Sequence, residues 1–251
     1  MSTTLVTGST AGLGLEVARR LGERGETLLV HGRDEGRLAE ARRSTGAAAG
    51  YRADLSSLEQ VRRLAGEISD AHGRLDLLLN SAGIIPGHER RLSADGHELG
   101  LAVNYLAGFL LWHDLRPARV INVSSIGQQE IDFDDVMLER GYTAMRSYSQ
   151  SKLAQILFTF ELAERAPDGV TSDALHPATL MDTRMVREFM GPRGARSTVD
   201  EGAGAVMHVI DSPGTGRYFD GREESTADPQ AYDAEARRRL WELGESLIST
   251  P

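Results

Sequence analysis

The sequence predicts an α/β fold in which a doubly wound parallel sheet of about seven strands is covered by helices on both faces. Short runs rich in Val, Ile and Leu alternate along the chain with longer segments whose apolar residues recur every three or four positions. The short runs are typical of strands buried on both faces, and the longer segments of amphipathic helices. The strands are expected at residues 3–7, 27–31, 48–52, 75–80, 119–123, 171–175 and 217–219. The helices are expected at residues 13–24, 35–44, 57–72, 94–114, 146–165, 198–211 and 230–248.

Composition limits the classes of function. The 251 residues are 40% hydrophobic and 26% charged, which is typical of a globular chain, and no linker or repeat divides them. One domain over residues 1–251 is therefore expected. A net charge of −9 repels polyanions, so nucleic acid is not expected as a partner. The chain has no cysteine, which excludes thiolate chemistry, and its seven histidines show no close-spaced metal-ligand pair.

The chain carries no recognisable targeting or membrane-spanning signal. Met1 is followed directly by the first predicted strand, without the basic and apolar segments of a signal peptide. The longest apolar stretch, at residues 99–112, is interrupted by Asn104 and is shorter than the ~20 residues that cross a bilayer. A cytoplasmic location without a membrane partner is expected.

The first predicted strand runs into a glycine-rich turn with Gly8, Gly12 and Gly14, and a helical pattern follows. Glycine permits positive φ and lets the main chain approach a phosphate, while the first N–H groups of the helix point at an anion. A tight turn with a purely structural role is the alternative. The position after the first strand favours a pyrophosphate cradle, because α/β sheets bind dinucleotides there.

The second predicted strand ends at His31 and is followed by Gly32, Arg33 and Asp34. An arginine at this strand end suits a ribose 2′-phosphate, so Arg33 favours NADP(H), with NAD(H) possible. The alternative for Arg33 is a solvated loop residue, and His31 is interpreted as strand packing. Further along, Ser57 with Gln60 resembles a capping box, which supports the helix predicted at 57–72.

The fifth predicted strand ends in two hydroxyls, Ser124 and Ser125. Either could donate a hydrogen bond to a substrate oxygen at the carboxyl edge of the sheet, or simply cap a turn. In the helix predicted at 146–165, Tyr148 and Lys152 are four residues apart and share a face. A neighbouring cation favours the phenolate and is expected to lower the pKa of Tyr148, which would tune it as a proton donor.

These motifs occur together in the order typical of the short-chain dehydrogenase/reductase family, which the chain resembles over nearly its whole length. Gly8, Gly12 and Gly14 match the T-G-x3-G-x-G turn of that family, and residues 80–83 are similar to its N-A-G element. The long interval before Tyr148 and the segment at 153–158 resemble the branch that contains retinol dehydrogenases.

The resemblance implies a single Rossmann-like NAD(P)-binding domain and an oxidoreductase that acts on CH–OH or C=O groups. It also implies a catalytic set of Ser125, Tyr148, Lys152 and Asn104, with Ser125 preferred over Ser124. Tyr148 would donate a proton to the carbonyl oxygen and Ser125 would polarise that oxygen. Lys152 would hold the ribose hydroxyls, and Asn104 would position a water in a proton relay.

The resemblance also implies which residues hold the dinucleotide. Asp54 matches the residue that binds the adenine ring, and either Thr179 or Thr183 contacts the carboxamide. The full set is Gly8, Ser9, Gly12, Leu13, Gly14, Arg33, Asp54, Leu55, Asn80, Ala82, Gly83, Tyr148, Lys152, Pro177, Leu180 and Thr183.

The substrate is expected to be a small molecule that binds between the loops at 126–145 and 177–197, because these follow strands in the second half of the sheet. Apolar residues in these loops favour a hydrophobic substrate, unless they are loop packing: Ile126, Ile131, Phe133, Met181, Met185, Phe189 and Met190.

An inactive dinucleotide-binding sensor or scaffold of the same fold is the first alternative function, and a methyltransferase is the second. The intact trio of Ser125, Tyr148 and Lys152 argues against both. A homodimer or homotetramer is also expected, since family members commonly pair through two helices whose apolar outer positions correspond here to Leu110, Leu111, Leu153, Leu157 and Phe160. The segment 126–145 could instead cover that surface and leave a monomer.

Overall fold

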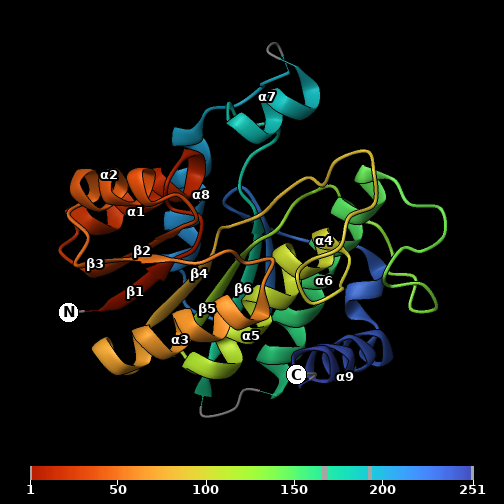
Figure 1. The fold of residues 1–251 in the computed structure, drawn as a ribbon. Helices are drawn as coiled ribbons and strands as arrows, with labels where there is room; N and C mark the ends of the chain where they lie inside the picture. Colours follow the sequence, from red (N-terminus) through yellow and green to blue (C-terminus); the bar gives the residue numbers. More distant parts are fainter. Residues whose placement is uncertain (1, 166–168, 192–193, 250–251) are drawn as a thin grey trace.

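The computed structural model describes residues 2–165, 169–191 and 194–249. These residues form one eight-stranded sheet in the order β3-β2-β1-β4-β5-β6-β7-β8 (Figure 1). The first seven strands are parallel, and β8 pairs antiparallel with β7. The strands are β1 (Thr3–Val6), β2 (Thr27–Gly32), β3 (Ala49–Arg52), β4 (Leu77–Asn80), β5 (Arg119–Val123), β6 (Thr171–His176), β7 (Arg217–Asp220) and β8 (Glu223–Ser225).

Helices cover both faces of the sheet, as Figure 1 shows. Helices α1 (Gly12–Glu23), α2 (Glu35–Thr45) and α8 (Val199–Asp211) lie on one face. Helices α3 (Leu58–His72), α5 (Ala107–Leu115), α6 (Ala144–Arg165) and α9 (Ala234–Ser249) lie on the other. The shorter elements are α4 (Leu99–Leu101), the π-helical η1 (Ala102–Leu106), α7 (Arg184–Met190) and the 3₁₀ turn η3 (Pro229–Tyr232).

The central strands are apolar throughout because successive side chains enter opposite cores. In β2, Leu28 and Val30 pack with α1 and α2, whereas Leu29 packs on the α3 side, and all three are fully buried. This alternation between two hydrophobic cores explains the continuous apolar runs in the sequence.

The predicted fold class is confirmed, but β8 and α7 were missed. The residues of β8 are polar and exposed or half-buried, so no apolar run marks this edge strand. None of the residues of α7, all of them described, is buried. Both elements therefore lack the buried stripe that a sequence pattern can detect.

The helix start predicted at Ser57 is correct, but only half of its capping box forms. The Ser57 hydroxyl accepts from the Gln60 N–H at 3.4 Å, while the Gln60 side chain accepts from the Asp54 N–H at 3.0 Å. A complete capping box occurs at the start of α8, between Thr198 and Glu201.

Helix α9 covers the outer side of α5 and α6. The ring of Trp241 packs edge-on against Trp112 and Phe109, with centroid separations of 4.9 and 5.3 Å. The expected intersubunit apolar surface is therefore wrong, because its residues are buried within one chain: Leu110, Leu111, Leu153, Leu157 and Phe160. A homodimer or homotetramer stays a prediction, now without that surface to support it.

No helix in the described part of the chain combines the length and the apolar character that a membrane span requires.

Candidate active site

Loops from four neighbouring strands meet at the carboxyl edge of the sheet, where open α/β folds bind their ligands. The turn after β1 contacts the loop after β4, since a Cβ added to Gly8 would lie 2.8 Å from Ala82 Cα. The loop after β6 reaches the same turn, with the Thr183 methyl 3.4 Å from a Cβ placed on Gly12. The loop after β5 leads into α6, which carries Tyr148 and Lys152.

The glycine turn has the geometry of an anion cradle. Gly8 and Gly12 adopt φ of 66° and 54°, a region that favours glycine. A Cβ on Gly14 would come within 2.6 Å of the Gly8 carbonyl oxygen, so this close approach also requires glycine. Among the described residues, no side chain caps the start of α1. Its first N–H groups are thus suited to a pyrophosphate, and the turn fits the dinucleotide that the motif implies.

Thr7 joins this turn to the loop after β4 and was missed by the sequence analysis. Its hydroxyl accepts hydrogen bonds from the N–H groups of Ser81 and Ala82, both at 3.0 Å, and donates to the Leu79 carbonyl at 3.3 Å. The only sequence signal for this role is its position directly before Gly8 in the motif.

His31 also supports the turn, which its interpretation as strand packing did not anticipate. Its Nδ1 accepts from the Gly8 N–H at 3.1 Å, and its Nε2 lies 3.1 Å from the Ala53 carbonyl oxygen. These contacts fit a neutral imidazole that donates from Nε2. Burial lowers the pKa of His31 to about 4, so the ring is neutral at physiological pH.

Several predicted cofactor-binding side chains are engaged within the protein. The Ser9 hydroxyl donates to the Val6 carbonyl at 2.9 Å and is fully buried. The Asp54 carboxylate accepts from the N–H and hydroxyl of Ser56, and Asn80 donates to the Asn122 side-chain oxygen at 2.9 Å. Leu13 and Leu55 are buried in the two cores.

The remaining predicted cofactor residues differ in their surroundings. Arg33 is exposed beside the end of β2. Leu180 adopts a left-handed φ of 48°, and Pro177 is buried. Of the two threonines, Thr179 has its hydroxyl 3.1 Å from His176 Nε2, whereas Thr183 caps α7 and faces Gly12.

Tyr148, Ser125 and Lys152 are brought together between β5 and α6. The Ser125 hydroxyl is close enough to the Tyr148 phenol to oppose the rise of its pKa, and the Lys152 ammonium lies 5.7 Å from the centre of the Tyr148 ring. The Lys152 Nζ donates to the Val123 carbonyl at 2.9 Å. The catalytic groups predicted from sequence are thus neighbours at the strand edge that faces the glycine turn.

Burial controls both titrating groups of this cluster. It raises the pKa of Tyr148, a rise that the Ser125 hydroxyl opposes, and it lowers the pKa of Lys152 to about 7. For this chain by itself, the expected lowering of the Tyr148 pKa by Lys152 is wrong. The reason is that removal from water penalises both charged forms, and this cost was not visible in the spacing of the two residues.

The two serines after β5 have different partners. The Ser124 hydroxyl donates to the Lys152 carbonyl at 2.7 Å and ties α6 to the strand. The Ser125 hydroxyl accepts from the Gly127 N–H at 3.0 Å and is close enough to the Tyr148 phenol to affect its pKa. Ser125 is therefore the serine next to the phenol, whereas the Ser124 hydroxyl is used in a hydrogen bond to the main chain of α6.

Asn104 lies in the π-helical turn η1, and its side chain is engaged by protein groups. Its Oδ1 accepts from the Ile84 N–H at 2.8 Å, and its Nδ2 donates to the Ile84 carbonyl at 3.0 Å and to the Ser151 hydroxyl at 2.8 Å. The side chain thus links the loop after β4 to α6, one residue before Lys152. The oxygen and the nitrogen of the Asn104 side chain are therefore both engaged by protein groups.

The loop after β5 is anchored, whereas the loop after β6 projects. Ile131 and Leu138 are buried, so the first of these packs in the core instead of lining a substrate site. In contrast, α7 stands away from the body of the protein in Figure 1, with Phe189 and Met190 exposed.

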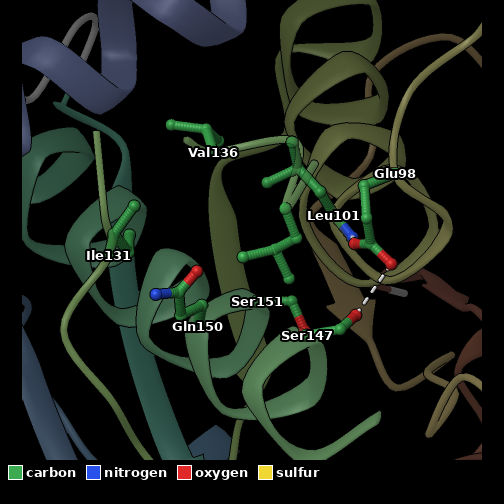
Figure 2. Close-up of a pocket in the computed structure, with 8 residues that line it drawn as sticks. Glu98, Leu101, Ile131, Val136, Ser147, Gln150 and Ser151 are labelled. Carbon is green, nitrogen blue, oxygen red and sulfur yellow. Dashed lines mark hydrogen bonds between the residues drawn. The ribbon is translucent and has the colours of Figure 1, made fainter. Parts of the chain in front are cut away.

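A small cavity of about 10 Å³ lies beneath the anchored loop, large enough for about one water molecule. Figure 2 shows the buried carboxylate of Glu98 reaching the Ser147 hydroxyl across this region, at 2.8 Å. The residues that line it include neither Tyr148 nor Lys152. It is therefore too small, and wrongly placed, to serve as the substrate site.

Comparison with known proteins decides the family. Residues 2–192 match the model of the short chain dehydrogenase family. The chain belongs to this family. As a short-chain dehydrogenase it is an NAD(P)-dependent oxidoreductase that acts on alcohol or carbonyl groups.

Curated relatives of this short-chain dehydrogenase fall in the retinol dehydrogenase branch. It is 32% identical to retinol dehydrogenase 13 of Homo sapiens, over 98% of this chain and 84% of that protein. It is 33% identical to retinol dehydrogenase 14 of Mus musculus, over 98% of this chain and 85% of the relative.

Solved structures agree with the fold. An uncharacterised protein from Mycobacterium paratuberculosis superposes with a TM-score of 0.84 at 29% identity, and the match covers 100% of this chain and 94% of the other. Pseudomonas aeruginosa RhlG, solved as an NADP complex, superposes with a TM-score of 0.69 at 24% identity over 87% and 94% of the two chains, which supports the fold alone.

Proposed function

We propose that this protein reduces a carbonyl group of a small hydrophobic molecule with NADPH, using Ser125, Tyr148, Lys152 and Asn104. The observation that carries the proposal is that the Tyr148 phenol has both the Ser125 hydroxyl and the Lys152 ammonium as neighbours, at the strand edge that also holds the glycine cradle. A site with a proton donor, an oxygen-polarising hydroxyl and a cation beside a phosphate cradle suits hydride transfer.

Each residue has a distinct part in the proposed reaction. The nicotinamide, when bound, supplies the hydride. Ser125 holds the carbonyl oxygen of the substrate, and Tyr148 donates the phenolic proton to that oxygen as charge develops on it. Lys152 holds ribose hydroxyls, and Asn104, which lies in the π turn, positions a water.

The protonation state of Tyr148 suits the reductive direction. Because burial raises its pKa, the phenol is protonated at neutral pH and ready to donate. Reduction requires this protonated form, whereas oxidation of an alcohol starts from the phenolate. The proposed direction is therefore from carbonyl to alcohol.

The hydrophobic character of the substrate is supported by two features. Ile126 and Phe189 are 57% and 37% exposed in the loops after β5 and β6, and Met190 is 50% exposed. The curated relatives are named for retinol, a hydrophobic alcohol. Loops 126–145 and 177–197 are accordingly proposed as the walls of the substrate site.

The main test replaces Tyr148 with phenylalanine, which removes the donor and little volume. Tyr148→Phe is expected to lose on the order of 100- to 10,000-fold in turnover while keeping its affinity for NADPH. NADPH absorbance with a panel of aldehydes and ketones measures turnover, and fluorescence titration measures cofactor binding. Wild-type protein that binds NADPH but turns over no member of a broad panel would instead favour the inactive sensor.

The choice of cofactor rests on Arg33, whose exposed position at the end of β2 suits a 2′-phosphate. Wild-type protein is expected to bind NADPH more tightly than NADH. Arg33→Asp should lower or reverse this preference, because the carboxylate repels the phosphate, while the nearby Arg37→Asp serves as a control. Equal affinity of the wild type for NADH and NADPH would show that Arg33 is a surface residue only.

A further inference from the structure

The Lys152 ammonium has a second buried partner besides the end of β5. Its Nζ donates to Val123 O and to the side-chain oxygen of Gln155, each at 2.9 Å. Lys152 and Gln155 are 5% and 2% exposed. The catalytic cation is therefore held between the strand and the next turn of its own helix, a contact that the sequence motif does not contain.

The segment that carries Gln155 is itself tied to the sheet. The Thr159 hydroxyl donates to the Gln155 carbonyl at 2.8 Å and accepts from Asn122 Nδ2 at 2.9 Å. Nearer the site, the Ser124 hydroxyl donates to the Lys152 carbonyl at 2.7 Å. Because β5 and the residue after it hold the helix on both sides of Gln155, the main chain that carries the Gln155 side chain cannot move far without breaking buried hydrogen bonds.

The two acceptors leave one direction for the third ammonium proton. An ammonium has three donors, and within residues 2–165, 169–191 and 194–249 two of them have acceptors. A Cβ on Gly83 would lie 3.2 Å from Nζ, so the loop after β4 passes directly beside the cation. That loop also contacts the glycine turn through Ala82.

We propose that Gln155 is a positioning residue for Lys152. Its side-chain oxygen accepts a hydrogen bond from one ammonium N–H, which keeps the lysine charged in a buried site. The remaining N–H then points toward the space beside Gly83. The inference rests on the proposed function, since that space is where the ribose of the dinucleotide would lie. Gln155 itself touches neither substrate nor cofactor in this scheme.

The electrostatics agree with this role. Burial lowers the pKa of Lys152 to about 7, so at neutral pH the charged and neutral forms are close in free energy. An amide oxygen that accepts from the ammonium favours the charged form. Among the described elements around the cation, α6 presents the Tyr148 phenol as the titratable group, whereas β5, η1 and the loop after β4 present the Val123 carbonyl, the Asn104 amide and Gly83.

Lys152 is the single lysine of the sequence, which permits a direct test. Protein labelled with ¹³Cε,¹⁵Nζ-lysine has one side-chain signal, whose chemical shift against pH gives the titration midpoint of Lys152. Gln155→Leu should lower this midpoint and Gln155→Glu should raise it by about one pH unit or more, as expected for loss of an acceptor and gain of a carboxylate. Gln150→Leu is the matched control, because Gln150 is a buried glutamine of the same helix that donates to Glu130 O at 2.7 Å.

The control should titrate with the wild-type midpoint, and thermal melts establish that each variant is folded. If either folded Gln155 variant also titrates at the wild-type midpoint, Gln155 does not position the charge and the inference is overturned. This readout needs neither cofactor nor turnover, so it is independent of the proposed function.

Kinetics test the consequence for catalysis. The alkaline limb of the pH profile of kcat/KM, where Lys152 loses its charge, should move in the same direction as the Lys152 midpoint in Gln155→Leu and Gln155→Glu. A shift in the midpoint without a matching shift in the profile of an active enzyme would also overturn the role. Failure of the wild type to oxidise NADPH with any carbonyl compound would contradict the proposed function alone.

Discussion

Two bases are buried in the candidate site, His31 beside the glycine turn and Lys152 beside Tyr148, the proposed proton donor. Their side chains are 2% and 5% exposed, and burial lowers the pKa of both. Their partners differ. His31 accepts from the Gly8 N–H and faces the Ala53 carbonyl, whereas Lys152 donates to two oxygen atoms.

The difference in partners distinguishes His31, which supports the turn, from Lys152, which is proposed to take part in catalysis. One donor and one acceptor match a neutral imidazole, so protonation of His31 would place a proton against the Gly8 N–H. Two acceptors match an ammonium, so the hydrogen bonds of Lys152 stabilise its charged form while burial destabilises it. Burial therefore does not distinguish the two roles, and the hydrogen-bonding groups around each base do.

Replacement of Lys152 by methionine should have the largest effect, on activity and not on folding. Lys152→Met removes the cation while filling similar volume, so turnover should fall on the order of 100- to 10,000-fold. The free energy of unfolding should change little, because the loss of a buried charge offsets the loss of the donor to Val123 O and to the Gln155 side-chain oxygen. NADPH oxidation and urea unfolding measure the two quantities, and a folded variant with more than a tenth of wild-type turnover would contradict the assignment.

Replacement of His31 should have the opposite result, a loss of stability with little change in kcat. His31→Leu leaves the Gly8 N–H and the Ala53 carbonyl without their partner, at a cost on the order of 1–3 kcal/mol for each buried group. His31→Gln, whose amide can both donate and accept, should recover part of this loss. Urea unfolding measures stability, and steady-state kinetics of the folded variant should show a higher KM for NADPH with kcat little changed. An unchanged free energy of unfolding in His31→Leu would mean that the imidazole does not support the turn.

His31 and Lys152 also show which parts of the site could be predicted from the sequence and which could not. Lys152 was found because its spacing from Tyr148 belongs to a motif, and the glycine turn was found because positive φ and close approach require glycine. His31 and Gln155 carry no such pattern. Their roles depend on which carbonyl and N–H groups the fold brings within about 3 Å. The sequence around a strand residue such as His31 or a helix residue such as Gln155 does not indicate those hydrogen-bond partners.

The failures have a physical basis too. The pKa of Tyr148 was predicted from a charge one helical turn away, whereas burial, a property of the whole fold, decides its direction. The outer faces of α5 and α6 were correctly identified as apolar, but the sequence did not indicate that Trp241 of α9 would cover them. Long-range packing of this kind has no local signal in composition or spacing.

The same two bases also predict how stability depends on pH, because each acts in a separate window. Between pH 6.5 and about 4 the unfolded chain binds a proton at His31 and the folded chain does not, so stability is full above pH 6.5 and falls as the pH drops toward 4. For Lys152 the window runs from its ordinary pKa of 10.5 down to about 7, and stability again falls as the pH drops. Each proton contributes a slope of at most about 1.4 kcal/mol per pH unit. Urea unfolding across pH should therefore show that His31→Gln flattens only the acidic window and Lys152→Met only the alkaline one. Profiles of both variants that run parallel to the wild type throughout would mean that the folded protein leaves these two pKa values unchanged.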